Sequence, residues 1–137
     1  MSSDLLCDPD SFACKVSSVL NRNVKEFGKK FLFDGREDTC WNSEQGKPQF
    51  IHIQFNDGQK RHLSELQIMF QGGFAGKSIK IINEDNCEVI FYPEDNNKLQ
   101  KFQLKDLFSG NKFKIVFEDS TDFFGRITVY KLCLISK

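Results

Sequence analysis

The sequence lacks the features that mark several large classes of protein. Basic and acidic residues are equal in number, 19 of each, so no net charge draws the chain onto a nucleic acid or an anionic membrane surface. No apolar run reaches the length of a membrane span. The five cysteines include no pair with the two-residue spacing of a zinc site or redox dithiol. These shortages argue against nucleic-acid binding, membrane insertion and zinc chemistry.

Residues 1–30 also lack a secretion signal, because Asp4, Asp8 and Asp10 interrupt the one candidate apolar segment. We therefore expect a soluble intracellular protein whose cysteines are mostly reduced packing residues. One alternative stays open: Cys7 or Cys14 would bond to Cys133 if the chain ends pair, which would suit an oxidising compartment.

The chain has the length of one domain. Its 137 residues include 15 phenylalanines, enough for a single core. Residues 1–13, rich in Ser and Asp, are expected to form a loosely ordered lead-in to a single domain over residues 14–137.

Patterns of period two predict strands along most of the chain. The clearest alternation places Ile51, Ile53 and Phe55 on one face of a strand. Other β-rich runs, bounded by turn residues, cover 66–70, 78–82, 88–92, 101–104, 112–117 and 126–135. About eight strands at this spacing predict an all-β antiparallel sandwich or barrel. Residues 104–108 are expected to form one helical turn, and Trp41 to anchor the core.

The last two expected strands flank a loop, as at a hairpin-like end of the sandwich. This loop combines turn residues with side chains typical of binding surfaces: Asp119, Asp122, Phe123 and Phe124. We expect at least one of the two phenylalanines to fold back and cover the end of the sandwich.

Residues 71–78 end in the Gly-Lys-Ser of a phosphate-binding loop. The leading glycine of that motif is replaced by Gln71, and the residues that follow are β-branched rather than helical. We therefore favour a loop between strands that displays Phe74.

Signals for catalysis are weak. His52 is expected on the outer face of a strand and His62 in a basic turn, and neither has a sequence neighbourhood that marks it as a base. Cys40, beside Trp41, is expected to be a buried packing residue rather than a nucleophile. Asp119 and Asp122 are expected on one mobile loop, which would not fix the separation that a pair of catalytic carboxylates needs. We expect no enzymatic activity.

The turn after residue 33 has two interpretations. Asp34, Asp38 and Thr39 offer oxygen ligands of the kind that calcium prefers. The alternative is that Asp34 and Asp38 cap the turn through its own backbone.

Several continuous segments of the sequence resemble known proteins. They lie at residues 17–23, 27–30, 39–43, 70–74, 91–97 and 117–126. Together with the segments 16–20, 34–41, 48–55 and 66–70 and the closing strand pair, they spread the resemblance over nearly the whole length of the chain. The chain resembles the discoidin, or coagulation-factor C-type, group of galactose-binding-like domains. Within that group it is similar to a family of small nuclear-receptor-associated proteins.

This resemblance implies an eight-stranded antiparallel jelly-roll β-sandwich without catalytic activity. It further implies an interaction module, expected to be a monomer, that binds a nuclear receptor and represses its transcriptional activity, in the nucleus and the cytoplasm. Calcium ligands would be Asp34, Asp38 and Thr39, although residues 130–134 offer no acidic side chain to complete the site. No other cofactor is expected.

Ligand-binding loops of the wider group map to residues 21–30, 42–47, 71–77 and 119–126. The expected partner-binding residues are Asn42, Gln71, Gly72, Gly73, Phe74, Asp119, Asp122, Phe123, Phe124 and Arg126. An alternative function is carbohydrate binding, with Phe74 as an aromatic platform and Arg126 or Asn42 as the polar fork.

Overall fold

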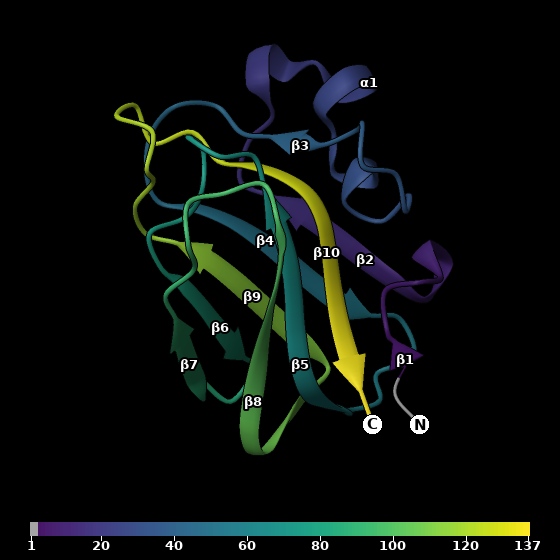
Figure 1. The fold of residues 1–137 in the computed structure, drawn as a ribbon. Coiled ribbons are helices and arrows are strands. Elements are labelled where there is room, and N and C mark those ends of the chain that lie inside the picture. Colours follow the sequence, from purple (N-terminus) through teal and green to yellow (C-terminus); the bar gives the residue numbers. More distant parts are fainter. Residues whose placement is uncertain (1–2) are drawn as a thin grey trace.

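The computed structural model describes residues 3–137, without the side chains of residues 105–107, as two antiparallel sheets packed face to face (Figure 1). One sheet has the order β1-β10-β5-β8, with β3 also paired to β10, and the other has the order β2-β4-β9-β6-β7. The strands are β1 (Ser3–Asp4), β2 (Phe12–Val16), β3 (Trp41–Asn42), β4 (Gln49–Phe55), β5 (Arg61–Phe70), β6 (Ile79–Asn83), β7 (Glu88–Phe91), β8 (Leu99–Gly110), β9 (Lys112–Phe117) and β10 (Thr128–Ser136). Eight of these ten strands have four residues or more, which confirms the predicted sandwich.

Four short helices occupy the first third of the chain. They are η1 (Pro9–Ser11), η2 (Leu20–Arg22), α1 (Val24–Phe27) and η3 (Lys29–Leu32). The side chain of Asn23 caps α1 by accepting a hydrogen bond from the Glu26 amide at 3.3 Å. Figure 1 shows α1 beside β3 at one end of the sandwich. Within residues 3–137, no helix has the length and apolar character that crossing a bilayer requires.

Aromatic side chains fill the space between the sheets. Trp41 is fully buried, and its Nε1 donates a hydrogen bond to the Ser18 carbonyl at 2.8 Å. The Trp41 ring lies 6.4 Å from the ring of Phe117, which in turn lies 5.7 Å from Phe70. This confirms Trp41 as a core anchor and explains why its one polar atom carries no burial penalty.

The alternation predicted for the strands is confirmed by burial. In β4, Ile51, Ile53 and Phe55 all point into the core, whereas His52 between them faces outward. In β5 and β9, the residues with the same spacing are likewise buried: Leu66, Ile68, Phe70, Phe113, Ile115 and Phe117.

The almost continuously apolar last strand is central, as predicted. β10 pairs with β5 on one side and with β1 and β3 on the other. The expectation of a hairpin-like end is wrong, because β9 belongs to the opposite sheet and residues 118–127 cross from one sheet to the other.

The helical turn expected at residues 104–108 is also wrong, since the backbone there is part of β8. Leu63 pairs with Phe108, whereas Glu65 pairs with Gln103, so residues 104–107 lie opposite Ser64 alone. Extra residues of this kind form a bulge that interrupts the ladder. Buried Leu104 and Phe108 lie four residues apart, a spacing that fits one face of a strand as well as one face of a helix.

The chain ends lie side by side. Residues 1–13 are predicted to be a loosely ordered lead-in, whereas Ser3 pairs with Ser136 and both Leu6 and Phe12 are buried in the core. All five cysteines are free thiols. Burial raises the pKa of Cys14 and of Cys133 to about 12 each, which keeps these two thiols protonated at neutral pH.

Replacing Phe117 should test the aromatic core. Phe117→Ala removes a ring that is 1% exposed, and we expect a loss of about 3–5 kcal/mol in the free energy of unfolding. Urea denaturation followed by the fluorescence of Trp41 would measure it. Tyr92→Ala is the control, because Tyr92 is 76% exposed and its loss should change stability by less than about 0.5 kcal/mol.

Candidate functional site

Three loops meet at one end of the sandwich. Residues 43–48 connect β3 to β4, residues 71–78 connect β5 to β6, and residues 118–127 connect β9 to β10. Each of these loops crosses between the two sheets. Backbone hydrogen bonds from Gly46 to Phe124 and from Thr121 to Ala75 join them at the same end, at the upper left of Figure 1. We call the residues 42–47, 71–77 and 119–126 the loop end.

The third loop is folded tightly by its own hydrogen bonds. The hydroxyl of Ser120 donates to the Arg126 carbonyl at 2.6 Å and accepts from the Asp122 amide at 2.9 Å. Gly125 has a φ of +86°, and a Cβ at this position would lie 2.6 Å from the carbonyl oxygen of Gly46. Only glycine therefore allows this close approach of the two loops.

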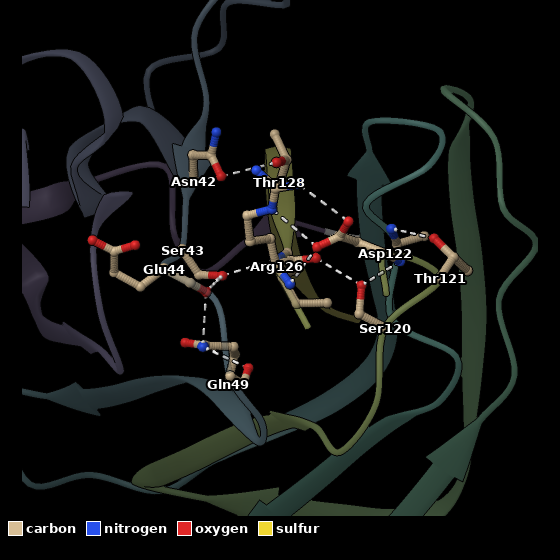
Figure 2. A network of polar contacts seen from close by, with 12 residues as sticks. Asn42, Ser43, Glu44, Gln49, Ser120, Thr121, Asp122, Arg126 and Thr128 are labelled. Atoms are coloured by element: carbon tan, nitrogen blue, oxygen red, sulfur yellow. Dashed lines mark hydrogen bonds and ion pairs between the residues drawn. The ribbon is translucent and has the colours of Figure 1, made fainter. Parts of the chain in front are cut away.

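Side-chain hydroxyls tie the three loops together (Figure 2). The backbone amide of Ser43 donates to the Ile127 carbonyl at 2.8 Å, and its hydroxyl accepts from the Ile127 amide at 2.8 Å. Thr121 bonds with Ala75 in the same reciprocal way, at 2.8 and 3.0 Å. These pairs take the place of the strand ladder, which is interrupted where the loops cross.

Gln49 supports the first loop from below. Its Nε2 donates to the carbonyls of Glu44 and Gly46, at 3.1 and 2.9 Å. Its Oε1 accepts from the hydroxyls of Ser17 and Ser18. The amide of Gln49 is therefore bonded on both sides although the residue is buried.

Arg126 is the centre of the exposed part of the loop end. Its Nε and Nη2 donate to the two carboxylate oxygens of Asp122, at 3.0 and 3.2 Å. The guanidinium carbon also lies 5.2 Å from the ring centre of Phe74 and 5.7 Å from that of Phe124. The Arg126 hydrogen bond holds the pKa of Asp122 below its ordinary value of 3.8, against the effect of desolvation.

The remaining predicted residues lie around this centre. Oδ1 of Asn42 accepts from the Thr128 hydroxyl at 3.2 Å, and the amide of Gln71 donates to the Thr128 carbonyl at 3.0 Å. Asp119 forms an ion pair with Lys47 at 3.0 Å.

Gly72 and Gly73 contribute through their backbone alone. Their amides donate to the side chains of Asn97 and Asp95, the latter at 2.7 Å. The loop that follows β7 thus holds residues 71–77 in place.

Phe123 and Phe124 both face solvent. They are 90% and 55% exposed, so the expectation that one of them covers the end of the sandwich is wrong. Trp41, Ala75 and Ile127 are fully buried at that end and already fill it. The two phenylalanine rings pack edge to face, 5.3 Å apart, and form an apolar tip.

Asp34, Asp38 and Thr39 do not converge on one point. Asp34 accepts from the Thr39 hydroxyl at 2.6 Å and from the Arg36 amide at 3.0 Å, whereas Asp38 turns to the Arg36 guanidinium, 2.8 Å away. Within the described residues no three His, Cys, Asp or Glu side chains form a metal-binding group. The cation of Arg36 beside Asp38 does not fit a calcium ligand set, and calcium binding here stays a prediction of the resemblance.

Two residues weighed for catalysis, His52 and Cys40, lie outside the loop end. His52 is on the outer face of β4. Partial burial is the largest cause that lowers its pKa, and the positive charges of Lys112, Lys114 and Lys15 lower it further. Burial raises the pKa of Cys40, which makes it a poor nucleophile at neutral pH. The Gly-Lys-Ser segment leads into strand β6 rather than a helix, as predicted.

Four supporting residues were not predicted: Ser43, Gln49, Ser120 and Thr121. Serine and threonine are ordinary loop residues, and Gln49 follows a proline at the start of a strand. No pattern in the sequence distinguishes their partners.

Solved structures with the same arrangement define the class. The family 32 CBM of Clostridium perfringens NanJ, in complex with galactose, covers 99% of this chain and all of that chain with a TM-score of 0.77 at 14% identity. An F5/8 type C domain from Bacteroides fragilis covers 95% of this chain and 94% of that chain with a TM-score of 0.76 at 13% identity. The fold is therefore that of the discoidin, galactose-binding-like domains, as the resemblance implied.

Curated relatives show the family, although no family model matches the chain. The nuclear receptor 2C2-associated protein of Danio rerio is 50% identical over an alignment of 142 positions that covers all of this chain and 98% of that protein. The human protein of the same name is 43% identical over all of this chain and 99% of its own length. The chain belongs to the family of nuclear receptor 2C2-associated proteins.

The pair of Asp122 and Arg126 predicts a pH dependence. The pKa of Asp122 is depressed in the folded protein, so its charge stabilises the fold above about pH 3.8, and this contribution is lost as the pH falls below that value. Asp122→Asn keeps the shape but not the charge. Since Arg126 stays partly in solvent, we expect the variant to be less stable by about 1 kcal/mol at neutral pH.

Urea denaturation at several pH values would measure the difference. The two proteins should converge in acid, and a constant difference would show that the charge of Asp122 is not its cause. Asp34→Asn is the control, because this exposed carboxylate is bonded to Thr39 rather than to a cationic side chain.

Proposed function

We propose that this chain is a non-enzymatic interaction module that binds a nuclear receptor through the loop end and represses its transcriptional activity. The names of its relatives support a nuclear-receptor-associated role. The observation that carries the choice of surface is the exposure of Phe123 and Phe124 on a loop fixed by hydrogen bonds.

The composition of this surface suits a protein partner. Aromatic residues and arginine are enriched among the residues that dominate binding energies, and Phe123, Phe124 and Arg126 stand together here. Lys47 and Asp119 provide a charged rim beside them. Because the loop is already folded, binding would cost little conformational entropy.

Repression would follow if the module covers a receptor surface that is needed for contact with DNA or with other proteins. On this proposal the protein acts as a monomer in the nucleus and cytoplasm, without a catalytic step, a cofactor or direct contact to nucleic acid. The equal numbers of acidic and basic residues agree with a protein rather than a nucleic-acid partner.

Carbohydrate binding is the second candidate, since the NanJ module was solved with galactose. Phe74 and Arg126 would be the platform and fork of such a site. Here the guanidinium of Arg126 lies over the Phe74 ring, and two of its nitrogens are engaged with Asp122. A sugar would have to compete with these contacts, which favours the protein-binding function.

The double variant Phe123→Ala, Phe124→Ala tests the proposal. We expect it to fold normally and to bind nuclear receptor 2C2 more weakly by about 2 kcal/mol or more, or roughly thirtyfold in Kd, because exposed aromatic anchors are lost. Isothermal titration calorimetry with the purified receptor would measure the change. Ile90→Ala, which removes an exposed apolar side chain from β7, is the control.

A reporter gene driven by the receptor would then show whether the same variant loses repression. Equal receptor binding by the native protein and the double variant would contradict the choice of surface. A galactose titration that shifts the NMR signals of residues 119–126, without receptor binding, would favour the second candidate instead.

A further inference from the structure

A groove of about 410 Å³ lies between β2 and the helices α1 and η3, and it shares no residue with the loop end's exposed cluster around Arg126. A volume of this size lies in the range of ligand-binding clefts, roughly 300–1,000 Å³. We call it the lysine groove. Its lining residues are Lys15, Val16, Val19, Val24, Lys25, Gly28, Lys29 and Lys30.

The floor of the lysine groove is apolar. Val16 and Val19 are partly buried and pack against the core, so their outer surfaces form a fixed base. Val24 projects from α1 and is 60% exposed, although it is a large apolar residue. An apolar side chain of a partner would cover all three valines and remove their surface from water.

The rim of the groove is positively charged on both sides. Lys15 stands on the β2 side, and Lys25, Lys29 and Lys30 stand on the helical side. In the described part of the chain none of these four ammonium groups takes part in an ion pair. The acidic residue nearest in sequence is Glu26, whose position on α1 adds one negative charge to this side.

Lys29 is fixed rather than free. Its Nζ donates a hydrogen bond to the carbonyl of Cys14 at 2.6 Å, across the open edge of β2. This contact covers an edge strand that would otherwise be available for pairing, and it holds one cation at the wall of the groove.

The hollow surface continues past this lysine. A second depression, of about 300 Å³, shares Lys29 and Lys30 with the first and extends along β2 to Pro9 and Phe12. The two depressions together follow the strand. Their length suits an extended chain better than a compact small molecule.

The positive charge also continues onto the sheet. Lys15 pairs with His52 across β2 and β4, and His52 pairs with Lys114 across β4 and β9. The zero net charge of the protein therefore conceals a face where positive charge is concentrated. Such a face attracts acidic partners over distances of about a Debye length, near 10 Å.

We propose that the lysine groove binds an acidic amphipathic peptide segment of a protein partner. Apolar side chains of the segment lie on Val16, Val19 and Val24, and its carboxylates face the lysines on both walls. A lipid would bring its anionic groups to one end only, whereas cations line both sides here. A nucleic acid would find no arginine among the lining residues of either depression, and no aromatic stacking surface in the lysine groove itself.

Fluorescence anisotropy with the full chain tests the proposal. The probe is a labelled peptide that alternates aspartate with leucine, and its control has asparagine in place of each aspartate. We expect binding of the acidic peptide to weaken with added salt. Lys25→Glu, Lys30→Glu should weaken it about tenfold, since two attractions become repulsions.

Two further variants make the test specific. Val24→Asp removes an apolar contact and adds a negative charge, and it should also weaken binding, because the side chain is exposed and its loss does not disturb the core. Lys98→Glu, Lys101→Glu reverses two exposed lysines beside and in β8 and should leave the affinity unchanged within about twofold. Circular dichroism would confirm that all variants fold.

Equal affinity of the native protein and the Lys25, Lys30 variant would overturn the proposal, as would equal binding of the acidic and asparagine peptides. Binding to vesicles that contain phosphatidylserine, with no binding of the acidic peptide, would also overturn it in favour of a membrane surface. Loss of peptide binding in this variant but not in Phe123→Ala, Phe124→Ala would support a second surface that is separate from the proposed receptor site.

Discussion

The arrangement of the loop end depends on the need of buried polar groups for hydrogen-bond partners. Regular pairing between strands is interrupted where three loops cross between the sheets, yet Ser43, Gln49 and Ser120 are buried there. The amide of Gln49 bonds two loop carbonyls and two serine hydroxyls, and Ser120 closes the loop that displays the phenylalanines. The exposed aromatic tip can therefore be rigid without being packed.

Much of the fold could be predicted because a strand in a two-layer sandwich has a local sequence signal, the alternation of apolar and polar residues. Alternating residues such as Ile51 and Ile53 mark one buried face, and the almost continuously apolar run of β10 marks a strand that has neighbours on both sides. Two predictions were wrong for a non-local reason. The four-residue spacing of Leu104 and Phe108 fits a helix as well as a strand, and the pairing with β5 decides between them. Nothing in residues 118–127 shows that β9 and β10 belong to different sheets.

The candidate site could be predicted in part. Turn residues and aromatics pointed to residues 119–126, and in the structure Arg126 of this loop lies over the ring of Phe74, while Asn42 bonds to Thr128 just after the loop. The supporting hydroxyls could not be predicted, because a serine has no local signal for a partner that lies 84 residues away, as Ser43 does for Ile127. Of the lysine groove, the resemblance implied only residues 21–30 as a ligand-binding loop, and the β2 side was missed for the same reason. Lys15 and Lys30 come from different elements, and each looks like an ordinary solvated side chain in the sequence.

Ser3 pairs with Ser136, so the first and last strands of the described residues are neighbours. They lie at the end of the sandwich opposite the loop end (Figure 1). A short peptide linker could join them with little change to the sheet, and the chain could then be opened at another surface turn. The order of strands along the polypeptide would change while their order in space stayed the same. Such a rearranged protein would separate the contribution of chain connectivity from that of side-chain packing in the folding of this domain.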